Sequence, residues 1–395
     1  MNLLKIIEYG IYHDNLDKKI SLPGIKNGFP QESFFNGKTL YDLNDFENIT
    51  SNLIHKSIKN ANNINLLCSG GVDSSILVYF LKKLNKKFLG IHNFYPSHHL
   101  NDLKKINSLK KFFKFNSKKI LISSKHYFKG MNIAIKSKYF GNTYSPTLYY
   151  SIDLNKKNKN KVLMTGSGPD ELFYGMEKYN LKFFEKLSDL KTPLALEKID
   201  TNYNEDFYLK ILNPLGLEVL NEVKNNRRLF YKKISKINNN LLEAQRILSY
   251  CTVSNQHFEM FEKLSKNFKM RHLSPFLNED YIRFAFSNKL LNFLDLSVGK
   301  KNKDANIGKK QLKQILTKYT SHNHAYDNKI GFHAPISKMI EKKLSFKTIQ
   351  SKIDFDKLER IIVIDKLKNN LKKNFILRKK NYNLYSILNL QKMIT

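Results

Sequence analysis

The sequence predicts an α/β fold in which a doubly wound, mostly parallel sheet is accompanied by a helical C-terminal part. Three observations lead to this fold class. From about residue 60, short apolar runs typical of buried strands alternate with stretches of helical periodicity. Two of these strand runs end directly in turns rich in glycine and serine. Beyond about residue 185, the apolar residues recur mostly at helical spacing.

The individual elements follow from the spacing of apolar residues. INLLC is the first clear strand, and the apolar residues that follow it lie on one face of a helix. Residues 1–57 show little periodicity and contain several prolines and glycines, which predicts a small, loop-rich segment. The expected elements of the sheet are the strands 64–68, 87–94, 119–122 and 161–165 and the helices 74–84 and 100–113.

Composition excludes several classes of protein. With 395 residues, of which 41% are hydrophobic and 12% aromatic, the chain is long enough for two or three folded domains. No apolar run approaches the roughly 18 residues of a membrane helix. Lys5 and Glu8 leave no room for the apolar core of a signal peptide, so we expect a cytoplasmic protein without a membrane span. Cys68 and Cys251 cannot form a disulfide framework.

The charge of the chain is strongly positive, since 68 basic and 34 acidic residues give +34. Such an excess of positive charge is typical of proteins that bind nucleic acid or an anionic surface. Lysine carries nearly all of the charge, however, and residues 1–226 contain no arginine, the side chain that base recognition favours. The lysines are spread over the whole chain, as a coding bias would spread them. The run 366–380 is the densest basic stretch and also fits a solvated helix face.

The strongest functional signal is the stretch SGGVDSS at 69–75, between a buried strand and an amphipathic helix. Two glycines let the backbone turn tightly, so that N–H groups at the helix N-terminus face phosphate oxygens. Ser69, Ser74 and Ser75 add hydroxyl groups, and Asp73 can hold the Mg²⁺ that accompanies a polyphosphate. The lysine of the GxxxxGK[ST] loop is absent. The form SGGxDS resembles instead the pyrophosphatase-type loop of enzymes that cleave ATP between the α and β phosphates.

A second loop, TGSGPDELF at 165–173, also follows a strand. Doubly wound sheets bind ligands beyond the carboxyl ends of their strands, so this loop is expected to face the first one. Asp170 is then a second metal carboxylate, and Glu171 a supporting cap or ligand. Taken alone, acidic residues at a helix start are explained by their favourable interaction with the helix dipole.

The two loops, in this order, resemble the synthetase domain of asparagine synthetases. That family also has a lysine in a helical region, followed about twenty residues later by a lysine, a glycine and a phenylalanine. Here Lys309, Leu312 and Lys313 precede Lys329, Gly331 and Phe332 at matching spacing. The segment MRHLSPFLN at 270–278 is similar to the family's RxPFLD segment. The resemblance covers about residues 50–340. It implies that Lys309 contacts the phosphates and the developing charge. Such a contact is worth about 3 kcal/mol of transition-state stabilisation.

Three departures from that family bear on the subfamily to which the chain belongs. Glutamine-dependent members begin with a cysteine on a glutaminase domain, whereas Asn2 follows Met1 here, which makes glutamine hydrolysis improbable. Ser167 replaces a glutamate that helps to handle ammonia, so the nucleophile need not be ammonia. Asp327 replaces an arginine of the pyrophosphate clamp. Similar losses occur in β-lactam synthetases and lasso-peptide cyclases.

The resemblance therefore implies an adenine nucleotide α-hydrolase-like fold and an ATP-dependent amide-forming ligase. The chain divides into a short N-terminal segment over 1–57 that is not a functional glutaminase, an ATP-binding synthetase domain over 58–345, and a basic helical tail over 346–395. A tRNA-modifying enzyme with the same ATP loop and a degenerate, non-catalytic binding subunit remain as alternatives. The expected partners are a small-molecule or peptide carboxylate, aspartate included, and a separate protein that supplies ammonia or carries the substrate.

The expected cofactors are ATP and Mg²⁺. His98 with His99, and His322 with His324, are interpreted as solvated loop histidines. The expected site residues are, for catalysis, Lys309, Asp73, Asp170 and Glu171; for cofactor binding, Cys68, Ser69, Gly70, Gly71, Asp73, Ser74, Ser75, Ile91, Thr165, Gly166, Lys309 and Lys329; and for the metal, Asp73 and Asp170.

Overall fold

The computed structural model describes most of the chain. The described residues are 3–12, 16, 21–35, 43–95, 100–136, 145–155, 161–176, 180–200, 205–326 and 354–376. Within these ranges, no helix combines the length and the apolar character that crossing a bilayer requires.

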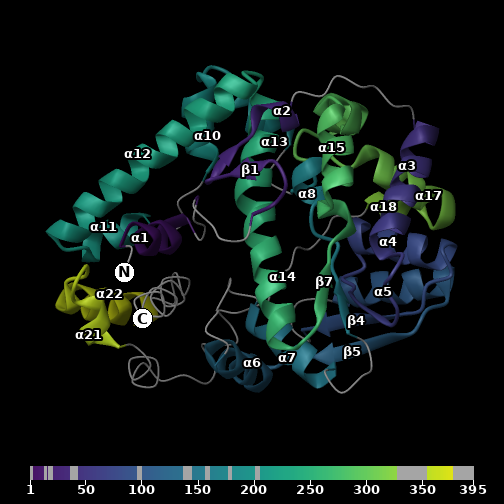
Figure 1. Ribbon diagram of the computed structural model, residues 1–395, viewed down its shortest axis with the longest axis horizontal. Helices are drawn as coiled ribbons and strands as arrows, with labels where there is room; N and C mark the ends of the chain where they lie inside the picture. Colours follow the sequence, from purple (N-terminus) through teal and green to yellow (C-terminus); the bar gives the residue numbers. More distant parts are fainter. Residues whose placement is uncertain are drawn as a thin grey trace.

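A five-stranded parallel sheet forms the α/β part of the molecule (Figure 1). Its strands lie in the order β5–β4–β3–β6–β7, and each neighbouring pair is parallel. From β3 the chain proceeds to β4 and β5 on one side and then returns to β6 on the other, so the direction of winding reverses between β3 and β6. The strand bounds are β3 Ile64–Leu67, β4 Phe88–Phe94, β5 Ser117–Leu121, β6 Val162–Met164 and β7 Arg271–Leu273.

The sheet is covered by helices on both faces, because alternate residues of its strands belong to two different hydrophobic clusters. Ile64 and Leu66 of β3 pack in the cluster that contains residues of α4 and α5, whereas Leu67 packs with α6 and α7. The bounds of these helices are α4 Val72–Lys83, α5 Leu100–Phe113, α6 Ser124–Lys136 and α7 Ser145–Asn155. The predicted doubly wound fold class is therefore confirmed.

Two features of the fold differ from the sequence-based expectation. The pattern predicts no strand at β7, because Arg271 and His272 leave no apolar run there. The loop-rich interpretation of 1–57 is wrong for most of its described residues, which are helical. Pro23, Gly24, Gly28 and Pro30 lie in or beside a small hairpin. In contrast, Ile6, Ile7 and Ile11 are buried on one helix face. The elements of this segment are α1 Leu3–Tyr12, β1 Ile25–Lys26, β2 Phe29–Pro30, α2 Glu32–Phe35 and α3 Leu43–Ile58, which extends past residue 57.

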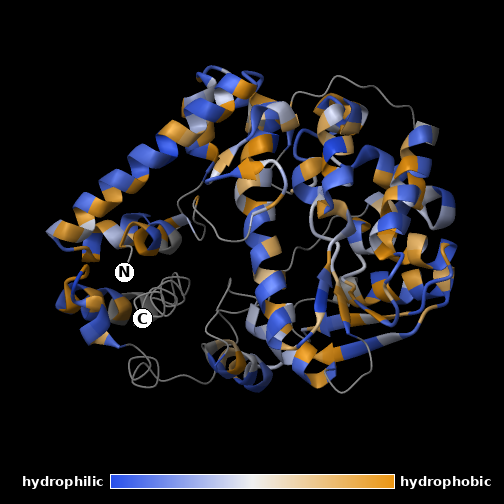
Figure 2. Ribbon diagram, viewed as in Figure 1, coloured by the Kyte–Doolittle hydropathy of each residue, from blue (hydrophilic) through white to orange (hydrophobic). Residues whose placement is uncertain are grey.

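A helical part surrounds the sheet and extends away from it. Its longest helix, α12 Pro214–Ile237, alternates hydrophilic and hydrophobic turns, as expected for a helix that packs by one face (Figure 2). Helix α13 Leu241–Ser249 continues through a π-helical turn, η1 Tyr250–Ser254, into α14 Asn255–Asn267. The other elements are α8 Pro169–Leu172, α9 Leu181–Glu185, α10 Thr192–Ile199, α11 Glu205–Ile211, η2 Pro275–Leu277, α15 Glu279–Ser287, η3 Leu290–Phe293, α16 Leu296–Lys301, α17 Lys310–Tyr319 and α18 His322–Tyr326.

The described part of the basic tail is docked on the helical part rather than free. It contains α21 Phe355–Leu358 and α22 Ile364–Ile376, which lie beside α11 (Figure 1). The backbone N–H of Val363 donates to the carbonyl of Ile211 at 2.7 Å, and that of Asn213 donates to Ile361 at 3.1 Å. Lys366 of this helix is exposed while Leu367 is buried. The helix therefore has a buried face with Leu367 and a solvent-exposed face with Lys366.

A buried ion pair fastens α1 to the helical part. The Arg227 guanidinium on α12 donates to Glu8 Oε1 of α1 and to Asp200 Oδ2 after α10, both at 2.9 Å. Arg227 is 1% exposed and Glu8 is 3% exposed, so removal of the Arg227 charge would leave the Glu8 carboxylate buried without this cation.

We expect Arg227→Ala to lower the free energy of unfolding by about 3–5 kcal/mol, because Glu8 then remains buried and charged. The neighbouring Arg228 pairs with Glu197 at the surface, so Arg228→Ala is the matched control and should cost less than about 1 kcal/mol. Urea unfolding of both variants measures the difference; equal losses would contradict the role of the buried pair.

Candidate active site

The first glycine-rich loop lies between the end of β3 and the start of α4. Gly70 adopts φ of +79°, a left-handed conformation that favours glycine. The chain turns at Gly70 and continues to Gly71, which directly precedes the first residue of α4. In the described part of the chain, no side chain caps this helix start. The first N–H groups of α4, which have no acceptor within the helix, are thus available to an anion.

The hydroxyl groups of the loop brace its backbone. Ser69 Oγ accepts from the Gly71 N–H at 3.3 Å, and Ser74 Oγ accepts from the Gly70 N–H at 3.2 Å and donates to the Gly71 carbonyl at 3.1 Å. Ser75 is fully buried and donates to the Gly70 carbonyl at 3.3 Å. These bonds hold the turn in its shape before any ligand arrives.

The second glycine-rich loop reaches the first at the switch point of the sheet. It follows β6 and begins α8, so that Asp170 and Glu171 lie in the first turn of that helix. A Cβ atom added to Gly166 would lie 3.2 Å from the backbone carbon of Asp73, so the two loops touch. The expectation that the loops face each other is therefore correct, because neighbouring parallel strands end at the same edge of the sheet.

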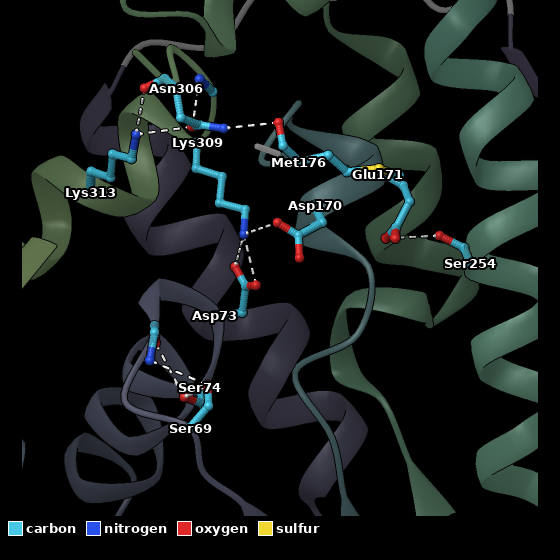
Figure 3. A network of polar contacts seen from close by, with 12 residues as sticks. Ser69, Asp73, Ser74, Asp170, Glu171, Met176, Ser254, Asn306, Lys309 and Lys313 are labelled. Carbon is cyan, nitrogen blue, oxygen red and sulfur yellow. Dashed lines mark hydrogen bonds and ion pairs between the residues drawn. The ribbon is translucent and has the colours of Figure 1, made fainter. Parts of the chain in front are cut away.

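Lys309 joins the two loops through their aspartates. Its ammonium lies 2.6 Å from Asp73 Oδ1 and 2.5 Å from Asp170 Oδ1 (Figure 3). The backbone at Lys309 is left-handed, with φ of +59°, and its N–H donates to the Phe173 carbonyl at 2.7 Å. Gly175 leaves room for the side chain, since a Cβ there would lie 1.8 Å from Lys309 Cε. A buried cation is thus held between two carboxylates from two strand ends.

Glu171 lies beside this cluster but points away from Lys309, toward the π-helical turn η1 (Figure 3). Its Oε2 accepts a hydrogen bond from Ser254 Oγ at 3.1 Å. Burial of the side chain, and then the charge of Asp170, raise the pKa of Glu171 well above its ordinary value of 4.5. Glu171 is therefore a protonated, internal support of the α8 turn at neutral pH.

Lys313 braces the segment that presents Lys309. Its ammonium donates to the Asn306 carbonyl at 3.1 Å, and the Asn306 amide donates to the Met176 carbonyl at 3.1 Å (Figure 3). Burial, and then the charge of Lys309, lower the pKa of Lys313 to about 8. The loop before α17 is in this way fixed to the loop after α8.

The remaining predicted site residues lie close to the loops or outside the described residues. Cys68 follows β3 and precedes the first loop, and its N–H donates to the carbonyl of Ile91 in the neighbouring strand β4 at 2.9 Å. Burial raises the pKa of the Cys68 thiol to about 11, which keeps it protonated. Thr165 is buried at the end of β6. Lys329, with Asp327, Gly331, Phe332, His98 and His99, lies outside the residues that the structure describes.

The sequence does not predict several contacts of the site. His324, interpreted as a solvated loop histidine, is buried, and its Nε2 lies 3.1 Å from Ser75 Oγ. The sequence also does not identify Ser254, Asn306 and His272 as residues of the site. No local pattern marks these residues, because a partner of each lies far away in the sequence. Ser254 contacts Glu171, Asn306 contacts Met176, and His272 contacts Thr165. The Ser75–His324 contact joins positions 249 residues apart.

Asp73 and Asp170 have the donor chemistry that Mg²⁺ requires. Mg²⁺ with a nucleotide is commonly held by one or two carboxylates together with phosphate oxygens. The two carboxylates converge on one point, which the Lys309 ammonium now shares. Among the described residues, no group of three or more His, Cys, Asp or Glu side chains forms a complete cage for a metal ion. The pair thus fits a metal ion that arrives with a polyphosphate.

We expect the stability of Glu171→Gln relative to the unsubstituted protein to increase with pH. A carboxyl whose pKa is raised in the folded state stabilises the fold below its unfolded pKa and loses that contribution as pH rises. Glutamine resembles the protonated acid and does not titrate. The difference in unfolding free energy should therefore grow by up to about 1.4 kcal/mol per pH unit between about pH 5 and pH 8.

Urea unfolding across that pH range measures the effect, and Glu279→Gln, at an exposed side chain, is the control. A stability difference that stays constant with pH would show that Glu171 ionises normally.

Comparisons with known proteins place the chain in a family. The family model described as asparagine synthase matches residues 53–366. No curated protein matches the chain. Among solved structures, an NMN synthetase from Francisella tularensis is similar at 14% sequence identity and a TM-score of 0.28; the matched part spans 34% of this chain and 59% of that one. Because the family match spans most of its length, the chain belongs to the asparagine synthase family, a family of ATP-dependent amide ligases.

Proposed function

We propose that this protein activates a carboxylate with ATP and transfers the acyl group to an amine. The observation that carries the proposal is the convergence of Asp73, Asp170 and Lys309 beside a glycine-rich helix start. That combination supplies an anion site, a carboxylate pair and a buried cation at one edge of the sheet. These are the parts that phosphoryl and nucleotidyl chemistry uses, in which positioning and electrostatics dominate.

In the first step, a carboxylate oxygen of the substrate attacks the α-phosphorus of ATP, and the bond to the β-phosphate bridging oxygen breaks. Pyrophosphate leaves toward the start of α4, where N–H groups and the helix dipole favour its charge. Lys309 stabilises the negative charge that grows on the α-phosphate. Asp73 and Asp170 would hold Mg²⁺, which neutralises charge on the phosphates when it is bound.

In the second step, an amine nitrogen attacks the acyl carbon, and AMP leaves with the oxygen that joined it to the acyl group. One amide, one AMP and one pyrophosphate are thus formed for each ATP consumed. The substrate is a small-molecule or peptide carboxylate, with aspartate among the candidates, and the amine is either ammonia from a separate protein or an amine on a substrate.

We expect Lys309→Met to reduce ATP–pyrophosphate exchange by about 10²- to 10³-fold, the cost of removing one preorganised charge donor from a site. Lys310 follows it directly, at the start of α17, so Lys310→Met is the matched control and should retain exchange. The assay screens aspartate and other carboxylic acids one at a time. Equal activity of the two variants would contradict the role of Lys309.

We expect Asp73→Asn and Asp170→Asn each to raise the Mg²⁺ concentration required for half-maximal exchange by at least about tenfold. Loss of a supporting partner alone already costs a metal site that much. Folding should be retained, as circular dichroism can verify, and chelation of Mg²⁺ should abolish exchange in every form. Asp189→Asn, at an exposed side chain, is the control; a normal Mg²⁺ requirement in both site variants would contradict the assignment of the metal to this pair.

A further inference from the structure

A chain of hydrogen bonds connects the second loop to β7 and α14. Ser167 Oγ donates to Thr165 Oγ1 at 3.4 Å, and Thr165 Oγ1 lies 3.0 Å from His272 Nε2. On the other side of the imidazole, His272 Nδ1 lies 3.2 Å from Glu262 Oε1. The four side chains come from the loop after β6, from β7 and from α14. Their order from the loop outward is Ser167, Thr165, His272 and Glu262.

The direction of these hydrogen bonds is the same throughout. Because the Glu262 carboxylate only accepts, His272 Nδ1 carries the ring proton, and Nε2 is left as the acceptor for the Thr165 hydroxyl. Thr165 in turn accepts from Ser167. Each hydroxyl can thus pass its proton outward as it receives another from the loop side. The Ser/Thr–His–carboxylate order is the one by which an imidazole accepts a proton and a carboxylate stabilises the resulting charge.

The surroundings keep the imidazole in a fixed orientation and in its neutral form. His272 is 6% exposed, and its ring lies against Phe261 and Phe258, with centroids 5.5 and 5.6 Å apart. Burial lowers the pKa of His272, and Glu262 opposes that shift in part. Glu262 faces the ring from α14, and Lys266 on the same helix acts on Glu262. The imidazole is therefore neutral, and able to accept a proton, at neutral pH.

The loop end of this network is Ser167, which is half-buried and is separated from Asp170 by two residues. Its neighbour Gly166 touches the backbone of Asp73. The Ser167 carbonyl accepts from Ser274 Oγ at 3.1 Å, which fixes the turn. Because Thr165 is buried, Ser167 is the more exposed of the two hydroxyl groups in the network.

We propose that Ser167, Thr165, His272 and Glu262 form a proton relay that accepts the proton of the attacking amine. The relay rests on the proposed function and belongs to its second step. As the amine nitrogen bonds to the acyl carbon, its proton passes to Ser167, the Ser167 proton to Thr165, and the Thr165 proton to His272 Nε2. The C–O bond to AMP breaks, and AMP leaves as the anion. Glu262 stabilises the imidazolium, which then returns its proton to solvent.

The decisive comparison separates the two half-reactions in the full-length protein. Pyrophosphate exchange reports adenylation alone. Amide formation from ammonium chloride, with the acid that supports exchange, also reports the amine step. His272→Gln should leave exchange unchanged and reduce kcat for amide formation by at least about 10²-fold, the lower range for a proton transfer aided by a positioned base. The KM for ammonium should stay the same.

Glu262→Gln is the second variant, because it keeps an oxygen for the Nδ1 proton and removes only the charge. The side chain of Glu262 is 25% exposed, so we expect the fold to tolerate this change. Loss of the carboxylate lowers the pKa of His272 further. The acid limb of the pH profile for amide formation should therefore move to lower pH, with a reduced plateau, whereas exchange keeps its profile. Glu259→Gln, one turn earlier on α14 and paired with Lys263, is the matched control.

Hydroxylamine offers an independent check, because its nitrogen is less basic than that of ammonia and, once bonded to the acyl carbon, loses its proton to water more readily. Its capture of the acyl group should be much less sensitive to His272→Gln than amide formation from ammonium. The relay is overturned if exchange and amide formation fall together in both variants, which indicates a structural role, or if Glu262→Gln leaves rate and pH profile unchanged. Failure of the unsubstituted protein to exchange pyrophosphate with any acid would instead contradict the proposed function, and the relay with it.

Discussion

The contact on which the rest of the site depends is the buried ion cluster of Lys309 with Asp73 and Asp170. Two carboxylates beside each other repel, and burial would magnify that repulsion. A cation between them removes it and lets the two strand ends approach. Much of the surrounding structure positions this cation: Gly175 leaves room for it, Phe173 holds its backbone, and Lys313 fixes the loop that precedes it.

The sheet explains why the cluster forms where it does. Strands β3 and β6 are neighbours, yet nearly a hundred residues separate them in the chain. Their carboxyl ends therefore open into a crevice at the point where the winding reverses. One end carries a helix start without a side-chain cap and the other carries the acidic turn of α8. An anion site and a carboxylate pair thus meet without either loop having to be long.

The second loop provides two kinds of chemistry. Asp170 shares the Lys309 ammonium with Asp73. Ser167 and Thr165 begin the hydrogen bonds that lead to the buried imidazole of His272. A reaction that first makes an acyl phosphate anhydride and then consumes it with an amine needs both, since the first step concerns phosphate charge and the second a proton.

The sequence by itself determined the fold class, four of the five strands and the two loops, because strand periodicity and glycine-rich turns are local properties. The resemblance to asparagine synthetases also pointed to Lys309. Only the tertiary structure decided that Lys309 bridges both aspartates, that His324 is buried against Ser75, and that His272 and Glu262 continue the hydrogen bonds of Thr165. Strand β7 and the helices of the N-terminal segment likewise appeared only there. These features arise from contacts between segments that are distant in the sequence. The residues next to a side chain in the sequence do not indicate which distant residue it contacts in the fold.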